Sequence, residues 1–419
     1  MYKQTKTFLN SFKNELLLSA LFIFPLLPIN YIGFVGVFLS TVLILINKID
    51  KKAMRKNLLL SIGYVFFLYV SLVYSENILE GWNQALKMIL LFLFPIVIIL
   101  FLPFKREYLN YIMITFIFVN VLLCLYIYNV AIDTLAHKKM MFLKDSTFLI
   151  RLKTFISTPY HVPFNWSSRD FKVFVFLHKA YVSLSLLLAY TLGFYYLCFK
   201  CLKNSYKLLL VFSLLFIGFF IFYMKSLPNL FLLLIVNLVL FFTSKYVTKV
   251  IVVIFMIVII SVTFFFQESI IELLKKTFEL INNDFRRHLW SCAIEVGKGN
   301  VLFGSGIGDM EADLLKCYSE SNIVDFSYAI RHKLNSHNQY AAFFVSGGLV
   351  VVLLFLCLLG NNLYLAISRK DVLFFCIILI LGFNFTFENV IYRIYGIYLF
   401  SIFNSFFLLR NSNLEVIND

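Results

Sequence analysis

The chain has 419 residues, of which 61% are hydrophobic and 14% are charged, and its mean hydropathy is +0.88. Soluble globular proteins are about half apolar and a quarter charged, so this composition excludes an ordinary soluble protein. The formal net charge of +15 would suggest nucleic-acid binding in a soluble chain. In a polytopic membrane protein, basic residues chiefly mark the cytoplasmic loops instead.

Apolar segments recur along the chain at lengths that approach the span of a bilayer core about 30 Å thick. They predict an all-α polytopic membrane protein, with residues 1–419 forming one membrane domain. The first segment is followed at once by another apolar run and lacks a small-residue cleavage site, so we interpret it as a membrane helix rather than a signal peptide. The twelve predicted helices occupy residues 14–29, 31–47, 58–75, 88–102, 109–131, 178–199, 208–224, 227–244, 249–267, 338–360, 371–387 and 393–409.

Lysine and arginine gather in alternate connections between these helices, and the opposite short turns hold only Lys87, Lys225 and Arg393. The positive-inside rule therefore predicts that both termini are cytoplasmic. Two long polar segments, 132–177 and 268–336, then face the periplasm.

The first long segment, 132–177, has a marked excess of lysine and arginine over aspartate. Such an excess suits an anionic partner such as phosphate or pyrophosphate. A basic loop beside anionic lipid headgroups is an equally good interpretation.

The second long segment, 268–336, has stronger signs of structure. Residues 282–284 can cap a helix that continues to Glu295, on which Arg286 and Trp290 share one edge because they are four residues apart. Cys292 and Cys317 both lie in this segment, so a disulfide between them is conceivable.

A glycine-rich turn follows, with glycine at 304, 306 and 308. It lacks the context of a nucleotide motif, and we expect it to let backbone approach either backbone or substrate closely. Asp309, Glu311 and Asp313 could suggest a divalent-metal cluster. Because they point in different directions along a helix and have no histidine beside them, we favour a solvated acidic turn and predict no metal and no cofactor.

Residues 331–340 close this polar segment and open an apolar one. Asn335 and Ser336 are expected caps of a helix that begins at Asn338, which places His337 at a helix N-terminus. That position disfavours imidazolium and offers free N–H groups to phosphate. We therefore predict His337 as a general base, with Arg331 and Asn338 among the substrate-binding residues.

Two further outer helix ends carry ionisable side chains. His178 and Lys179 open the helix predicted at 178–199, and Glu388 and Arg393 occupy the turn between the last two helices. For Glu388 and Arg393, a structural ion pair and a role in catalysis are equally well supported.

These motifs resemble the O-antigen ligase family of integral-membrane glycosyltransferases, and most of all its Bacteroidetes members. The resemblance is carried by Arg286 with Trp290, by Gly304 and Gly306 in the glycine turn, and by residues 334–340 and 347–349. Weaker similarities lie at residues 74–77, 178–181 and 386–389.

The resemblance implies a GT-C-like membrane fold, and transfer of a polysaccharide from undecaprenyl diphosphate to an acceptor hydroxyl such as that of lipid A-core. The reaction would use neither a metal nor a nucleotide sugar, at the periplasmic face of the bacterial inner membrane. By position, His337 would be the base and Arg286 would hold the carrier's pyrophosphate. A related polymerase that joins carrier-linked repeat units is an alternative, and a transporter or flippase is less favoured because the helices hold few internal charges.

The sequence departs from the family at one outer turn. The family often has a Ser-Arg pair between the helices predicted at 208–224 and 227–244, where this chain has Lys225 followed by Ser226. Lys225 is a candidate to supply the missing positive charge, and an arginine of the first long segment is another.

Overall fold

The structure is a computed structural model, and it describes residues 16–27, 29–46, 56–100, 106–137, 150, 178–200, 203–244, 284–320, 326–331 and 333–409. The regular secondary structure of these residues is entirely helical. The chain divides into two compact units, Met1–Ile32 with Lys105–Met256, and Gly33–Phe104 with Ile257–Asp419. The helix predicted at 249–267 and most of the basic segment 132–177 lie outside the described residues.

In the first unit, helix α9 is the most enclosed element. Ser185 on α9 donates a hydrogen bond to Asn120 (2.8 Å), and Tyr190 donates one to Asn237 (3.1 Å). Side-chain hydrogen bonds of this kind join helices that have no hydrophobic driving force between them in lipid. The described elements are η1 (Leu21–Leu26), α6 (Arg106–His137), α9 (Lys179–Phe199), α10 (Asn204–Tyr223) and α11 (Leu227–Thr243).

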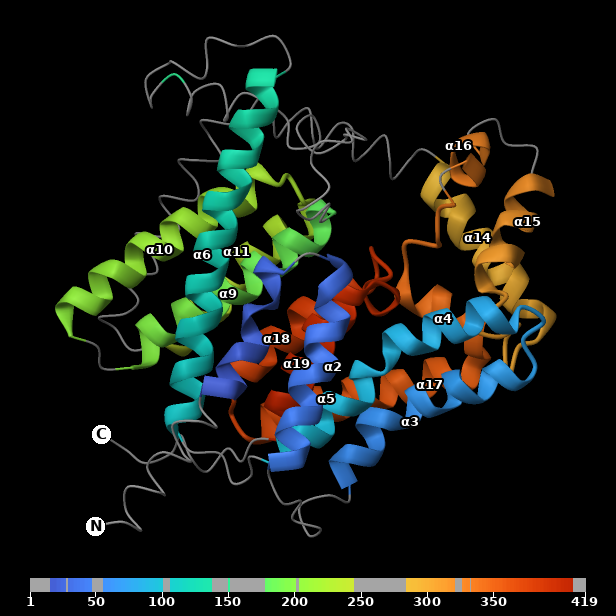
Figure 1. Ribbon diagram of the computed structural model, residues 1–419, viewed down its shortest axis with the longest axis horizontal. Helices are drawn as coiled ribbons and strands as arrows, with labels where there is room; N and C mark the ends of the chain where they lie inside the picture. The colour runs from blue at the N-terminus through green and yellow to red at the C-terminus, as the bar shows by residue number, and fades with distance from the viewer. Residues whose placement is uncertain are drawn as a thin grey trace. The chain divides into compact units, whose positions relative to one another are not determined.

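The second unit holds the apolar helices α3, α5 and α17 and the amphipathic helix α4 close together, and the more polar helices α14, α15 and α16 grouped together (Figure 1). Its elements are most of α2 (Ile29–Ile46), α3 (Lys56–Val70), η2 (Ser71–Val73), α4 (Ile78–Met88), α5 (Leu90–Ile99), α14 (Asp284–Gly299), α15 (Met310–Glu320), α16 (Phe326–Arg331), α17 (Gln339–Ser368), α18 (Val372–Asn384), η4 (Val390–Tyr392) and α19 (Ile394–Leu409).

Five described helices are long and apolar enough to cross a membrane, and six shorter apolar helices accompany them. Each of these eleven overlaps one predicted segment, so the prediction of an all-helical, multi-pass membrane protein is confirmed, while the total of twelve spans stays a prediction. Two boundaries differ substantially. The helix predicted to end at 360 continues to Ser368. The helix predicted to begin at 88 is preceded directly by α4, and the resulting span is Ile78–Ile99.

Helix α17 is sharply broken at Gly348, where φ is 63° and ψ is −164°. The ring of Phe355 lies 5.0 Å from that of Phe343 and 6.1 Å from that of Tyr340. In a continuous helix, residues 343 and 355 would be about 18 Å apart along the axis. The first arm, 339–347, is therefore folded back on the second arm, 349–368, and the prediction of one continuous helix over 338–360 is wrong.

The backbone groups freed by this break bind a segment that precedes α15. Leu349 N–H donates to the Val301 carbonyl (2.8 Å), Val350 N–H donates to Leu302 (3.2 Å), and Ser305 N–H donates to Val345 (2.8 Å). Irregular backbone within a membrane domain is tolerated where the protein satisfies its polar groups. Residues 301–305 are thus part of the structure of α17.

We predict that Gly348→Ala lowers the free energy of unfolding by about 1–3 kcal/mol, because alanine is strained at positive φ and its Cβ would collide with the Leu302 carbonyl group. Gly360→Ala is the matched control, since a Cβ there meets nothing within 4 Å and alanine favours a helix by about 1 kcal/mol over glycine. Thermal unfolding of both purified variants in detergent measures the difference. A Gly348→Ala protein that melts no lower than Gly360→Ala would contradict the role given to Gly348.

Candidate functional site

The imidazole of His337 pairs with a carboxylate from a distant part of the chain. Its Nδ1 lies 3.2 Å from Oε2 of Glu388, and the two side chains are only 22% and 12% exposed. His337 itself has a φ of 46°, a left-handed conformation in which few side chains other than those of Asn, Asp and His are found. Its N–H donates to Oδ1 of Asn335 at 3.0 Å, which holds the turn.

This contact decides what the imidazole can do. An ionised carboxylate only accepts hydrogen bonds, so the tautomer of His337 that carries its proton on Nδ1 can donate to Glu388 and keep the lone pair on Nε2 as an acceptor. The carboxylate of Glu388 also stabilises the imidazolium that forms when Nε2 takes a proton. The pair has the geometry of a general base with its orienting group.

Three further hydrogen bonds join the two segments that carry this pair. Gln339 N–H donates to the Phe385 carbonyl (2.8 Å), and Ile391 N–H donates to Oε1 of Gln339 (2.7 Å). The Ser336 hydroxyl contacts Oδ1 of Asn389 at 3.3 Å. Ser336, Gln339 and Asn389 are fully buried, so the loop that bears Glu388 is fixed against the start of α17.

The start of α17 differs from the prediction. Asn338 is the N-cap, with its side chain accepting from Ala341 N–H at 3.0 Å, and the helix begins at Gln339. Gln339 N–H is already bound to Phe385. The chain itself thus occupies the N–H groups of Gln339 and Ala341, and Asn338 has a capping role. The anion site expected at this helix N-terminus stays a prediction.

Helix α14 presents two of the predicted site residues. The Arg286 side chain is half-buried and has no ion partner among the described residues. The indole N–H of Trp290 is buried and lacks an acceptor within the part of the chain that the structure describes. The helix continues to Gly299, four residues beyond the predicted end at Glu295.

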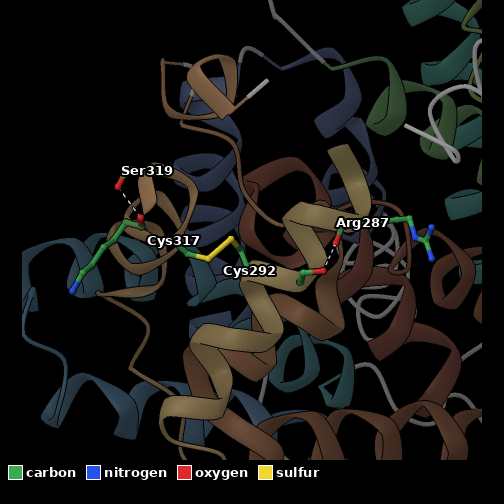
Figure 2. The surroundings of a disulfide bond; sticks show 6 residues. Arg287, Cys292, Cys317 and Ser319 are labelled. Carbon is green, nitrogen blue, oxygen red and sulfur yellow. Dashed lines mark hydrogen bonds between the residues drawn. A yellow bond between two sulfur atoms is a disulfide. The ribbon is translucent and has the colours of Figure 1, made fainter. Parts of the chain in front are cut away.

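A disulfide joins α14 to α15. Cys292 and Cys317, whose pairing the sequence left open, are bonded with a Cα–Cα distance of 5.8 Å. Figure 2 shows this bond between the two helices, with the side chain of Arg287 extending away from it. The cross-link restrains the helix that carries Arg286.

The backbone of the glycine turn packs closely against neighbouring parts of the protein. We call residues 304–309 the glycine clasp. A Cβ on Gly304 would collide with the carbonyl oxygen of Val345, and one on Gly306 with the hydroxyl of Ser75. A Cβ on Gly308 would collide with the carbonyl oxygen of Asn77. Of the two possibilities that the sequence left open for Gly304 and Gly306, the structure therefore supports close approach of backbone to protein.

Asp309 anchors the clasp to the corner between η2 and α4. Its side chain is buried, and its two carboxylate oxygens accept N–H groups of Glu76 (2.8 Å) and Asn77 (2.7 Å). The prediction of a solvated acidic turn is thus wrong for Asp309, although the partly exposed Glu311 pairs with Lys333 at 3.5 Å. Among the described residues, no group of three or more His, Cys, Asp or Glu side chains could hold a metal ion.

Side chains from the same corner complete the contact. Ser71 Oγ accepts from Ile307 N–H (3.0 Å), Ser75 Oγ accepts from Gly308 N–H (3.2 Å), and the Tyr74 hydroxyl donates to Phe303 (2.5 Å). Burial raises the pKa of Tyr74, an effect that a hydrogen bond with Ser71 partly offsets. The tyrosine therefore stays protonated and able to donate.

The remaining candidates are Arg331, which lies close to His337 in the chain, and three residues of the first unit. Arg331 is exposed at the end of α16. In the first unit, His178 stands at the N-cap of α9 and Lys179 is its first residue, while Lys225 adopts a φ of 49° in the turn between α10 and α11. Asn229 donates to the Ala180 carbonyl at 3.5 Å. Lys225 and Lys179 thus lie on neighbouring segments of the first unit.

A family model described as O-antigen ligase matches residues 208–356. This segment carries the O-antigen ligase signature. The resemblance drawn from the motifs is confirmed for this O-antigen ligase segment, which contains Arg286, the glycine clasp and His337 but ends before Glu388. No curated protein matches the chain.

We predict that Asp309→Asn destabilises the O-antigen ligase segment, because an amide can accept only one of the two N–H bonds. The free energy of unfolding should fall by about 1–3 kcal/mol, the cost of an unsatisfied buried donor. Asp313→Asn on α15 is the control, since the Asp313 side chain is partly exposed and has no hydrogen bond among the described contacts. Equal melting temperatures for the two variants, measured in the same detergent, would count against the anchoring role.

Proposed function

We propose that the protein is a glycosyltransferase of the O-antigen ligase type that moves a polysaccharide from undecaprenyl diphosphate to a hydroxyl of lipid A-core. The observation that carries this proposal is the His337–Glu388 pair, whose histidine lies within the O-antigen ligase segment. The reaction needs a base for a sugar hydroxyl, and this pair offers one. No metal or nucleotide sugar takes part in the proposed step.

The acceptor oxygen attacks the anomeric carbon of the carrier-linked sugar. As the new C–O bond forms, the acceptor proton passes to Nε2 of His337, and the bond between the anomeric carbon and the diphosphate oxygen breaks. The carboxylate of Glu388 stabilises the resulting imidazolium. The carrier diphosphate leaves with the bonding electron pair, and the proton on His337 is later lost to solvent.

Fixed cations would stabilise the leaving diphosphate. Arg286 is the first candidate, because guanidinium is permanently charged and forms two parallel hydrogen bonds with phosphate. The buried indole N–H of Trp290, one turn further along α14, is a second donor on the same helix. We assign substrate-binding roles also to Arg331 and, in the first unit, to His178, Lys179 and Lys225.

The cellular arrangement follows from the charge distribution. With both termini in the cytoplasm of a bacterium, segments 132–177 and 268–336 face the periplasm, and His337 lies at the periplasmic side of the inner membrane. This is the side on which a carrier-linked polysaccharide would be transferred to lipid A-core.

A polymerase would use the same base and leaving group with a different acceptor, another carrier-linked glycan. A deletion strain separates the two functions. Loss of a ligase leaves bare core and accumulated carrier-linked polymer, whereas loss of a polymerase leaves core that bears a single repeat unit. Unchanged lipopolysaccharide in the deletion strain would contradict both.

We predict that His337→Ala lowers the transfer rate by about 10²- to 10⁴-fold, the usual contribution of a positioned general base. Glu388→Gln should also lower kcat, because an amide orients the ring but cannot stabilise the imidazolium. The measurement is transfer of glycan from a carrier diphosphate to acceptor by purified protein in detergent, with EDTA present. Glu320→Gln, a substitution of an exposed carboxylate on α15, serves as the matched control.

A second pair of variants tests the phosphate role on α14. Arg286→Ala should reduce transfer strongly, whereas Arg287→Ala, which removes the exposed neighbouring guanidinium, should leave it nearly unchanged. Full transfer by His337→Ala would disprove the base, and an absolute requirement for a divalent metal would disprove the metal-free mechanism.

A further inference from the structure

A cluster of apolar side chains projects from the polar segment between α14 and the glycine clasp. Val301, Leu302 and Phe303 are 42%, 57% and 47% exposed. We call these three residues the apolar tip, and we infer that the apolar tip is inserted into the lipid leaflet at the membrane surface opposite Arg369 and Lys370. The inference does not depend on the proposed function.

The position of the tip is fixed by its bonds to α17. Val301 and Leu302 accept the N–H groups of Leu349 and Val350, the first residues after the break at Gly348. The tip therefore lies level with the start of the second arm of α17. It cannot move away without leaving those two N–H groups unpaired.

The length of the second arm indicates the depth at which the tip lies in a bilayer. Residues 349–368 rise about 30 Å at about 1.5 Å per residue, which equals the thickness of the hydrocarbon core. Arg369 and Lys370 follow directly, and such basic residues mark one edge of that core. Leu349 and the apolar tip then reach the opposite edge of the core.

The surface of the second arm is continuous with the tip. Exposed apolar residues follow one another along the arm at helical spacing, as expected of a lipid-facing stripe. The stripe consists of Leu349, Leu353, Leu356, Leu363 and Ile367. Because Leu349 is bonded to Val301, the tip extends this stripe at its far end, so acyl chains that cover the stripe also reach the tip.

Tyr74 supports an interfacial location. It is 40% exposed, and its hydroxyl donates to the Phe303 carbonyl. Tyrosine is enriched where hydrocarbon meets headgroups because it has an apolar ring and a polar end. The apolar tip would thus hold the polar segment, with α14 on one side and the glycine clasp on the other, against the membrane surface.

Quenching of a probe on single cysteines tests the inference in the full-length chain. The native cysteines other than Cys292 and Cys317 are replaced by alanine, and Leu302→Cys and Phe303→Cys are labelled with bimane in phosphatidylcholine vesicles. Lys298→Cys at the exposed end of α14 is the polar control, and Leu356→Cys in the stripe is the lipid reference. Two tip positions are labelled so that the measurement remains possible if one of the two variants fails to fold.

We expect phospholipid labelled with doxyl at carbon 5 to quench positions 302 and 303 at least half as strongly as position 356. Aqueous iodide should quench position 298 several-fold more than either tip position. Iodide quenching at 302 and 303 equal to that at 298 would overturn the inference, because the tip would then lie in water. Weak quenching by both reagents would also overturn it, because protein would then cover the tip.

Discussion

The second unit depends on the hydrogen bonds that residues 301–305 make with the broken helix α17. A helix interrupted at Gly348 exposes N–H and carbonyl groups that no water can satisfy inside a membrane domain. Val301, Leu302 and Ser305 satisfy them, and so the break is stable only when the polar segment is docked. The same docking permits the first arm, 339–347, to fold back until Tyr340 and Phe343 contact Phe355.

The arrangement of the candidate site follows from that fold. His337 lies just before the first arm, and its buried neighbours Ser336 and Gln339 bind the loop that carries Glu388. A charged side chain at the edge of a bilayer is costly unless it is paired, and the 3.2 Å contact between His337 and Glu388 provides the pairing. The contact that lowers this cost is therefore also the one that the proposed general-base chemistry uses.

Two motifs that lie far apart along the chain, residues 74–77 and the glycine clasp, are in contact. The weaker one at 74–77 supplies the N–H groups that Asp309 accepts, and Ser71 and Ser75 receive the N–H groups of the glycine clasp. This explains why small residues are needed at 304, 306 and 308, where no room for a side chain remains. The clasp positions α15. The disulfide between Cys292 and Cys317 then links α15 to α14, the helix that carries Arg286.

The sequence by itself determined the membrane class, the approximate position of eleven apolar helices and the helix that carries Arg286. It also pointed to His337 as a candidate base, a role that stays a prediction. Apolar length, helix caps and motif spacing are local properties, and they can be read within about 20 residues. Only the tertiary structure decided that α17 breaks at Gly348, that Asp309 is buried and that Glu388, rather than a helix N-terminus, supports His337. Each of these outcomes depends on a hydrogen-bond partner that is 40 to 233 residues away, which no local pattern specifies.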